Sequence, residues 1–247
     1  MVVGGCDVGL FKMIIREKLT SIRYRNENSA DYEPNDRCLG WPSAGLCWGI
    51  HQLDAKRDPC LKKAAEMAEK ALGLDEENTT ALSALALALV HLDKHAAALR
   101  AAQRAVELNA SSSLAHVNLA ACSLLSGQAH EALKSIDTAL RLSPLDPQKF
   151  SRMALRASAL FLLKRYDEAA RCAEQSRAIQ RFHTASRVLA ASYAQLGQMD
   201  KARDAVNELL SMRKGDTSIS EVTSLFLNVE DREHYAEALR KAGLPET

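Results

Sequence analysis

The sequence predicts an all-α protein in which helical hairpins stack into a solenoid, and three observations support this. Five alanines occupy the same place in a recurring local pattern, with spacings of 34, 34, 37 and 33 residues. Each lies between helix-like segments joined by a short turn signal, which is typical of a helical repeat. Apolar residues make up 47% of the chain but aromatic residues 5%, and the apolar residues are mainly Ala and Leu, both strong helix formers. The five alanines are Ala64, Ala98, Ala132, Ala169 and Ala202.

Residues 1–42 do not match the repeat, and we expect an atypical N-terminal segment there, either a cap or disordered. Residues 12–19 favour a helix, and the polar stretch after them ends in the turn-forming residues Pro34, Asn35 and Asp36. The glycine-rich start MVVGGCDVG has no basic region before a continuous apolar core, so it is a poor secretory signal. It also lacks the residues of a phosphate-binding loop.

The repeats begin with a partial unit. Its first helix, about residues 44–54, is weak because Pro42 and glycines interrupt the pattern. Its second helix is clear, since Asp58 suits the N-cap and Pro59 the first helical position. Four more units complete an array that we expect over 43–215. Their helix pairs are 79–92 with 94–108, 112–125 with 128–142, 147–163 with 166–180, and 183–196 with 199–212.

Two features mark the later part of the chain. The three extra residues of the 37-residue spacing are placed in the connection 143–149, after which the helical pattern resumes. Residues 216–247 predict capping helices, at about 217–227 and 231–241, because terminal repeats are commonly atypical.

Small residues recur where the two helices of a hairpin must approach closely, since interaxial distance follows side-chain size. We expect alanines where the first helix of a hairpin (helix A) meets the second (helix B) and where helix B meets the next repeat, with leucines filling the space between them. The alanines are Ala86, Ala120, Ala98, Ala132, Ala105 and Ala139, and the leucines are Leu82, Leu85, Leu89 and Leu119.

These features resemble the tetratricopeptide repeat over about residues 45–215. Gly127 and Gly197 stand at its inter-helix turn and Pro144 at its end, while its Trp, Tyr and Phe are mostly replaced by Leu, Ala and Val. Trp48 resembles such a Trp in the partial unit. The resemblance implies a right-handed superhelix that offers an extended surface to a partner protein.

A narrower resemblance covers the last two-thirds of the chain. The segments ALRLSPLDP, LKRYDEAARCAE and REHYAEALRKAGLPE are similar to the C-terminal repeats of rhizobial class III adenylate/guanylate cyclases, and such regions also follow winged-helix regulator domains. There the repeats are an accessory region behind a catalytic or DNA-binding domain. This chain has no stretch for the mixed α/β cyclase domain and no strand-borne pair of metal-binding aspartates, so we do not carry cyclase activity over.

The concave groove is the candidate site, because helix A lines it in the tetratricopeptide fold. Registering the repeats on their shared alanine predicts an apolar lining of small residues with one charge, which suits a partner's helix or extended apolar segment. A clamp for carboxylates would need several Lys, Arg and Asn, and the chain offers Arg187 and Asn118. The groove could instead hold the chain's own N-terminal segment. The predicted groove residues are Thr80, Ser83, Leu87, Leu114, Val117, Asn118, Leu124, Ser158, Phe161 and Arg187.

Other chemistry is weakly signalled. His91 and His95 have a metal-binding spacing, but a turn at 93–94 separates them and no third ligand is evident. His116 and Cys122 are six residues apart on one helix and face opposite sides, so a Cys–His nucleophile pair is not favoured. We therefore predict no metal, no cofactor and no catalytic residue.

Charge and cysteine usage limit the function further. Lys and Arg number 32 and Asp and Glu 31, a near-balance that argues against a nucleic-acid binder. Six cysteines without a C-x-x-C pair indicate reduced thiols in a cytoplasmic protein, and no apolar run is long enough to span a membrane. We predict a non-enzymatic protein-interaction scaffold; the alternative is a regulatory repeat module of a cyclase or transcription regulator, encoded apart from that domain.

Overall fold

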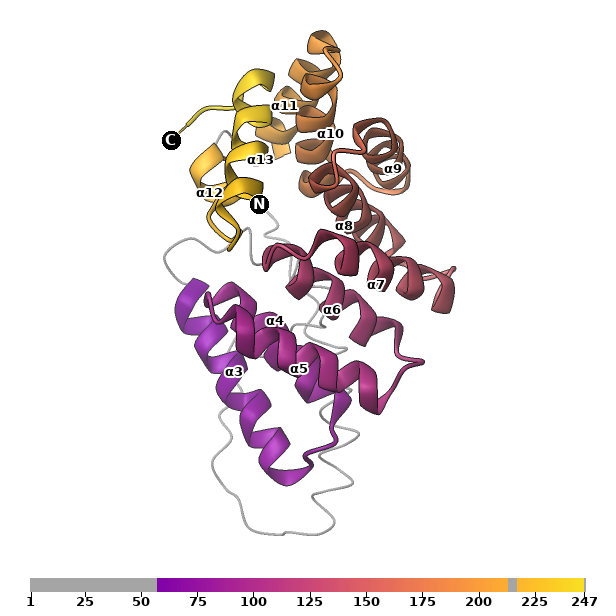
Figure 1. The fold of residues 1–247 in the computed structure, drawn as a ribbon, viewed down its shortest axis with the longest axis vertical. Helices are drawn as coiled ribbons and strands as arrows, with labels where there is room; N and C mark the ends of the chain where they lie inside the picture. The colour runs from indigo at the N-terminus through magenta and orange to yellow at the C-terminus, as the bar shows by residue number, and fades with distance from the viewer. Residues whose placement is uncertain (1–56, 213–216, 247) are drawn as a thin grey trace, which may run out of the picture.

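The computed structural model describes residues 57–212 and 217–246, and this part of the chain contains eleven helices (Figure 1). The all-α prediction is confirmed. The helices are α3 (Arg57–Leu74), α4 (Thr79–His91), α5 (His95–Leu108), α6 (Ser113–Leu125), α7 (Ala129–Leu142), α8 (Lys149–Leu162), α9 (Tyr166–Ile179), α10 (His183–Gln195), α11 (Met199–Met212), α12 (Ile219–Thr223) and α13 (Val229–Ala242).

The helices pack as consecutive hairpins. α4 pairs with α5, α6 with α7, α8 with α9 and α10 with α11, and α3 packs on the first of these pairs. The first helix of each hairpin also contacts the first helix of the next, so the hairpins form one stack. Figure 1 shows the stack running from α3 to α11, with α12 and α13 beside its second half.

The turn inside each hairpin has the same geometry four times. Its central residue has a left-handed backbone, with φ of 59° at Asp93, 81° at Gly127, 60° at Lys164 and 73° at Gly197. The next amide donates to a carbonyl five residues back, for example Gln128 N to Ser123 O at 2.8 Å, which satisfies a carbonyl at the helix end. The predicted turns at Gly127 and Gly197 are therefore confirmed.

The recurring alanines fill the closest helix contacts. Each of the six alanines predicted at such contacts has no exposed surface, and the four leucines predicted between them are also buried. In the second hairpin, Ala120, Ile136 and Ala139 pack together with Val117. Small side chains at these places let the axes approach while the larger residues close the remaining gaps.

The helix ends follow local capping. Asn78 and Ser112 accept hydrogen bonds from Ala81 N and Ala115 N at the starts of α4 and α6. The extra residues near 143–149 are divided between the connection and the helix that follows it. The connection 143–148 is longer than 109–112, and α8 has 14 residues where α6 has 13.

The tail differs from its predicted bounds. α12 is a short helix, because the chain turns after Thr223 toward Asn228, whose side chain accepts bonds from Glu230 N and Asp231 N and starts α13. α3 begins at Arg57, one residue before the predicted cap.

Several predictions fall on residues outside those described. These are the N-terminal segment 1–42, the weak helix 44–54, Trp48, and the cysteines Cys6, Cys38 and Cys47. Within the described ranges, no helix has both the length and the apolar character needed to cross a membrane.

Candidate partner-binding surfaces

The ten predicted groove residues lie on the first helices of four successive hairpins, α4, α6, α8 and α10. Eight of the ten are buried, and Thr80 and Leu114 are partly exposed. Asn118 donates to the Ser83 carbonyl at 3.2 Å and so joins α6 to α4, while Ser158 donates to Ala154 O within α8. The prediction that Leu87, Val117 and Leu124 line an open groove therefore needs correction, because all three belong to core clusters and Val117 packs with Ile136 and Ala139 of α7.

Helix α13 covers the part of the surface that α8 and α10 contribute. Phe161 of α8 has no exposed surface, and the His234 ring stacks on it at 5.1 Å between centroids. Tyr235 lies 5.0 Å from the same ring, and Tyr166 lies 5.4 Å from it on the other hairpin helix. Phe161 is thus the centre of an aromatic cluster, in which such ring pairs each add stability beyond their buried area.

Arg187 of α10 is also held by α13. Its Nε donates to the Tyr235 hydroxyl at 3.1 Å, and its guanidinium carbon lies 5.7 Å from the centroid of that ring. Burial raises the pKa of the Tyr235 phenol, so the hydroxyl stays protonated and accepts from the guanidinium. The predicted lone charge of the groove is therefore used to hold the chain's own helix.

The start of α13 is fixed to the second hairpin. Leu227 N donates to Leu125 O at 2.8 Å, which attaches the α12–α13 connection to the end of α6. A Cβ on Gly127 would come within 2.9 Å of the Asn228 Cβ, so this turn needs a glycine for space as well as for its positive φ.

The prediction that Phe161 and Arg187 line an open groove thus needs correction. They do lie on the expected helices, but α13 occupies the surface in front of them. The repeat period places residues within the stack, whereas the return of a terminal helix depends on tertiary contacts that periodicity does not encode. The amphipathic pattern of α13 is compatible with this placement, because the residues of its apolar face are buried: Tyr235, Ala238, Leu239 and Ala242.

A second surface lies on another side of α8, facing α7. Arg156 and Phe161 are five residues apart, which separates them by about 140° around the helix. Here α7 and α8 border an open cleft of about 690 Å³, which we call the basic cleft. It is lined by Lys134, Asp137, Thr138, Leu140, Arg141, Lys149, Met153 and Arg156.

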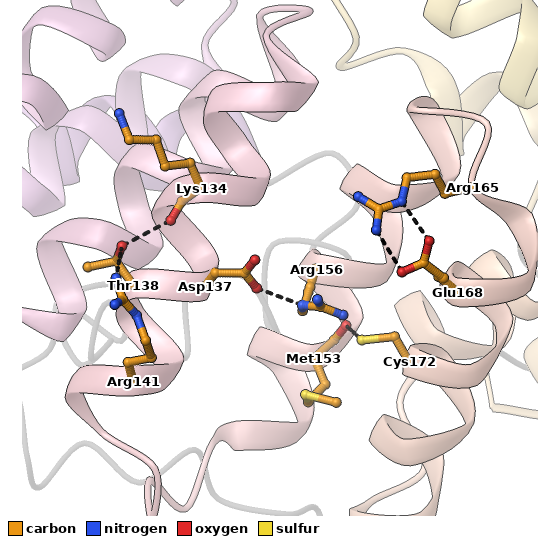
Figure 2. Close-up of polar contacts among 9 residues, drawn as sticks. All are labelled: Lys134, Asp137, Thr138, Arg141, Met153, Arg156, Arg165, Glu168 and Cys172. Atoms are coloured by element: carbon orange, nitrogen blue, oxygen red, sulfur yellow. Dashed lines mark hydrogen bonds and ion pairs between the residues drawn. The ribbon is translucent and has the colours of Figure 1, made fainter.

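Arg156 organises one end of the basic cleft. Figure 2 shows its guanidinium between Asp137 of α7 and Cys172 of α9, and its Nε donates to Asp137 Oδ1 at 2.6 Å. The Cys172 thiol donates to Met153 O at 3.3 Å, and burial raises the pKa of that thiol. A protonated, hydrogen-bonded thiol is a packing group here rather than a nucleophile.

Sequence reasoning missed the basic cleft, although a signal was present. Lys134 and Arg141 are seven residues apart on α7, and so are Lys149 and Arg156 on α8. Seven residues are close to two helical turns, so each pair lies on one side of its helix. That these sides of α7 and α8 face each other follows once the stacking of the hairpins is known.

The residues of each weaker candidate lie on different elements or make different contacts in the structure. His91 ends α4 and His95 begins α5, and His95 lies against Ser126 with a 3.4 Å contact between Nδ1 and Oγ. The His116 ring contacts Ala110 O, whereas the Cys122 thiol donates to Ala86 O, so these two side chains serve different contacts.

Comparisons with solved structures identify the fold. The structure of TTC0263, a tetratricopeptide protein of Thermus thermophilus, matches 81% of this chain and 100% of that one with a TM-score of 0.56 and 20% identity. PilW, a widely conserved type IV pilus biogenesis factor, matches 81% of this chain and 90% of its own with a TM-score of 0.58 and 19% identity. The structure of Pseudomonas aeruginosa pilF matches 79% of this chain and 86% of its own, with a TM-score of 0.55 and 17% identity.

At these identities the likeness shows the fold, which is that of stacked tetratricopeptide repeats. Comparison of the sequence with protein-family models gives no match, and comparison with curated proteins gives none either.

Proposed function

We propose that this chain is a non-enzymatic cytoplasmic scaffold that binds a protein partner through its tetratricopeptide stack. The observation that supports this most directly is the seating of α13 on α8 and α10. There the face of the stack that the first helices of the hairpins form holds an amphipathic helix. Phe161 and Arg187 of the stack contact Tyr235 of that helix through aromatic and charge-assisted interactions. A surface that accepts a helix from its own chain has the chemistry to accept one from a partner.

The partner surface that we assign is the matching face of the first two hairpins. Its predicted residues are Thr80, Ser83 and Leu87 on α4 and Leu114, Val117, Asn118 and Leu124 on α6, and five of these are buried: Ser83, Leu87, Val117, Asn118 and Leu124. Thr80 and Leu114 are the partly exposed members, and we propose that a partner's apolar segment contacts the stack there. The remaining predicted residues lie on α8 and α10: Phe161 and Arg187 contact α13, and Ser158 is buried on α8.

The non-enzymatic assignment is supported by the roles of the reactive side chains. The Cys122 and Cys172 thiols donate to main-chain carbonyls of neighbouring helices. The Cys172 thiol, which forms no disulfide, also fits a reducing compartment. We expect purified protein to make no cyclic nucleotide from ATP or GTP with Mg²⁺ or Mn²⁺. Turnover that survives repurification would contradict this assignment.

An alternative is a regulatory module that acts on a nucleotide cyclase or transcription regulator domain. The observation that favours it is the resemblance of the closing segment REHYAEALRKAGLPE, which forms most of α13 and its left-handed end at Gly243. Under this alternative the partner is such a domain, encoded separately. Co-purification of the chain with a cyclase or winged-helix protein from its own cell would support the alternative.

Site-specific photo-crosslinking in cells tests the scaffold proposal with the full chain. A benzophenone side chain is placed at Leu114 in one variant and at Gln103, exposed on α5, in a matched variant. We expect one discrete protein adduct from Leu114 and none from Gln103. Adducts with the chain's own residues 1–56 at Leu114 would indicate that the groove holds its N-terminal segment. Equal adducts at both positions, or none, would contradict a partner in the groove.

A further inference from the structure

The α7–α8 junction differs from its neighbours in charge at equivalent positions. The eight residues that line the basic cleft include four cations and one carboxylate, a net charge of +3. Aligning the repeats on their shared alanines gives the equivalent residues at the other junctions. The eight equivalent residues at the α5–α6 junction include Arg100, Arg104 and Glu107, a net charge of +1. At the α9–α10 junction they include Arg171, Arg177 and Glu174, again +1.

The strongest departure is Arg156 itself. Its equivalents in the other hairpins are Leu85, Leu119 and Leu189, all buried in the core. A charged side chain in the core would cost desolvation and lost packing, and the Arg156 side chain avoids part of that cost because it is 29% exposed. The ion pair with Asp137 compensates in part, and it neutralises the single carboxylate of the cleft.

The other cations of the cleft remain available. Among the described residues, neither Arg141 nor Lys149 forms an ion pair with a carboxylate, and Arg141 donates to the Thr138 hydroxyl at 3.2 Å. Lys134 has a loose partner, Glu131 at 3.9 Å, and its side chain is 78% exposed. Such an exposed pair contributes little and gives way easily to a better anion.

The shape of the cleft limits the ligand. Lys134 and Arg141 are separated by about 10 Å along α7, from a rise of 1.5 Å per residue. That length matches about three residues of an extended chain. Met153, Leu140 and the Thr138 methyl group supply apolar contacts between the charged ends. A short chain with a carboxylate at each end of such a stretch would meet Arg141 and Lys149 at one end and Lys134 at the other.

We propose that the basic cleft between α7 and α8 binds a short acidic peptide segment of a partner protein. This deepens the scaffold function, because it adds a charged anchor away from the groove. A nucleic acid is disfavoured, since it engages a long basic face, whereas Glu131 lies next to one end of the cleft and Asp146, paired with the buried Arg152, lies near the other.

The test uses the full chain and a fluorescein-labelled hexaglutamate peptide, measured by fluorescence anisotropy at low ionic strength. The cleft variant is Arg141→Glu with Lys149→Ser, which gives this junction the side chains found at Glu107 and Ser112 one repeat earlier. The matched control is Arg100→Glu with Lys94→Ser, the same charge change on exposed residues at and just before α5. Far-UV circular dichroism and melting curves establish that both variants are folded.

We expect the wild-type chain to bind hexaglutamate but not hexaglutamine, and the cleft variant to bind at least about tenfold more weakly, since charge pairs steer and hold such ligands. The control should stay within about twofold of wild type, and binding should weaken as salt screens the charges. Absence of wild-type binding, or equal losses in both variants, would overturn the proposal.

A single-stranded oligonucleotide of equal charge is the third arm. Tighter binding than the peptide, lost in the cleft variant, would assign the cleft to nucleic acid and overturn the acidic-peptide proposal. The photo-crosslink at Leu114 reports on the groove independently, so failure of the cleft and failure of the scaffold function are distinguishable.

Discussion

The α5–α6 and α7–α8 junctions are the same structural unit one repeat apart, and they are built from different interactions. Between α5 and α6 the connection is 109–112, Ser112 caps α6, and Leu119 packs into an apolar cluster. Between α7 and α8 the connection is 143–148, no side chain caps α8, and Arg156 takes the place of Leu119. Asp146 instead ties the connection to the buried Arg152 with a 2.6 Å ion pair.

The comparison teaches that the repeat determines the backbone but leaves the junction surface free to vary. Ala98 and Ala132 are fully buried at equivalent places, so the hairpin contacts are the same. The substitutions are instead at the residues between hairpins, where Leu119, Ala115 and Ser112 become Arg156, Arg152 and Lys149. A solenoid can tolerate this because each junction contacts its neighbours alone.

The largest expected effect comes from moving the charge to the wrong junction. Leu119→Arg should lower the free energy of unfolding by about 3–5 kcal/mol, because the residue equivalent to Asp137 at this junction is Gln103 and the charge is left uncompensated. Urea unfolding measures this. Leu119→Met is the control and should cost less than about 1.5 kcal/mol. Adding Gln103→Asp should recover part of the loss, and a loss as small as that of Leu119→Met would show that the junctions are interchangeable.

The next effect tests what the junctions share. Ala132→Leu should cost about 1–3 kcal/mol, because a larger side chain forces the helices of the hairpin apart. Ala98→Leu should cost a similar amount, since both alanines have no exposed surface. Thermal unfolding of the two variants checks this. Unchanged melting in either one would mean that the contact register differs between the hairpins.

A smaller effect is expected when the α7–α8 junction is given the residues of its neighbour. Arg156→Leu combined with Asp137→Gln should change stability by less than about 1 kcal/mol, because a partly exposed ion pair contributes little. Urea unfolding should therefore be nearly unchanged. A loss of several kcal/mol would show that the ion pair is a structural requirement of this junction.

The smallest effect concerns pH at the α5–α6 junction. Burial lowers the pKa of His95, and Asp93 offsets part of that. The unfolded chain therefore binds a proton more readily, so stability is full above about pH 6.5 and falls as the pH drops below it. His95→Ala, which copies Ala129 of the next hairpin, should reduce this fall by less than about 1 kcal/mol. Urea unfolding at about pH 8 and about pH 5.5, on either side of the ordinary histidine pKa, measures the difference. If stability fell more steeply with decreasing pH in the variant than in the wild type, the His95 effect would have the opposite sign and the prediction would be wrong.

Burial lowers the pKa of His234 as well, and Lys164 adds to this effect. His234→Phe keeps a ring on Phe161 and removes that titration. Comparing the two variants separates the contribution of the α5–α6 junction from that of α13.

The hairpins were predictable from the sequence because their signals are local. Caps such as Asn78 and Ser112 and the glycines at 127 and 197 lie within a few residues of the helix ends that they set. Asp93 and Lys164 adopt the same left-handed turn without a glycine, so there the turn had to be inferred from the repeat.

The site was less predictable, since it depends on contacts between distant residues. Registration placed Phe161 and Arg187 on the correct helices, but their contact with Tyr235 joins segments 74 and 48 residues apart in the sequence. The basic cleft likewise needs the facing of α7 and α8, which no single helix pattern contains. The groove on α4 and α6 remains a prediction.

The hydrogen bond from Leu227 to Leu125 has a consequence for the order of folding. It joins residues 102 positions apart, whereas most contacts of a solenoid are between neighbouring hairpins. During synthesis the α3–α6 region could assemble as soon as it leaves the ribosome. The side of the Phe161 ring that faces α13, in contrast, is not covered until His234 and Tyr235 have been made, so α8 and α10 must wait with an apolar face open to water. The second half of the stack should therefore depend more on chaperones during its production than the first.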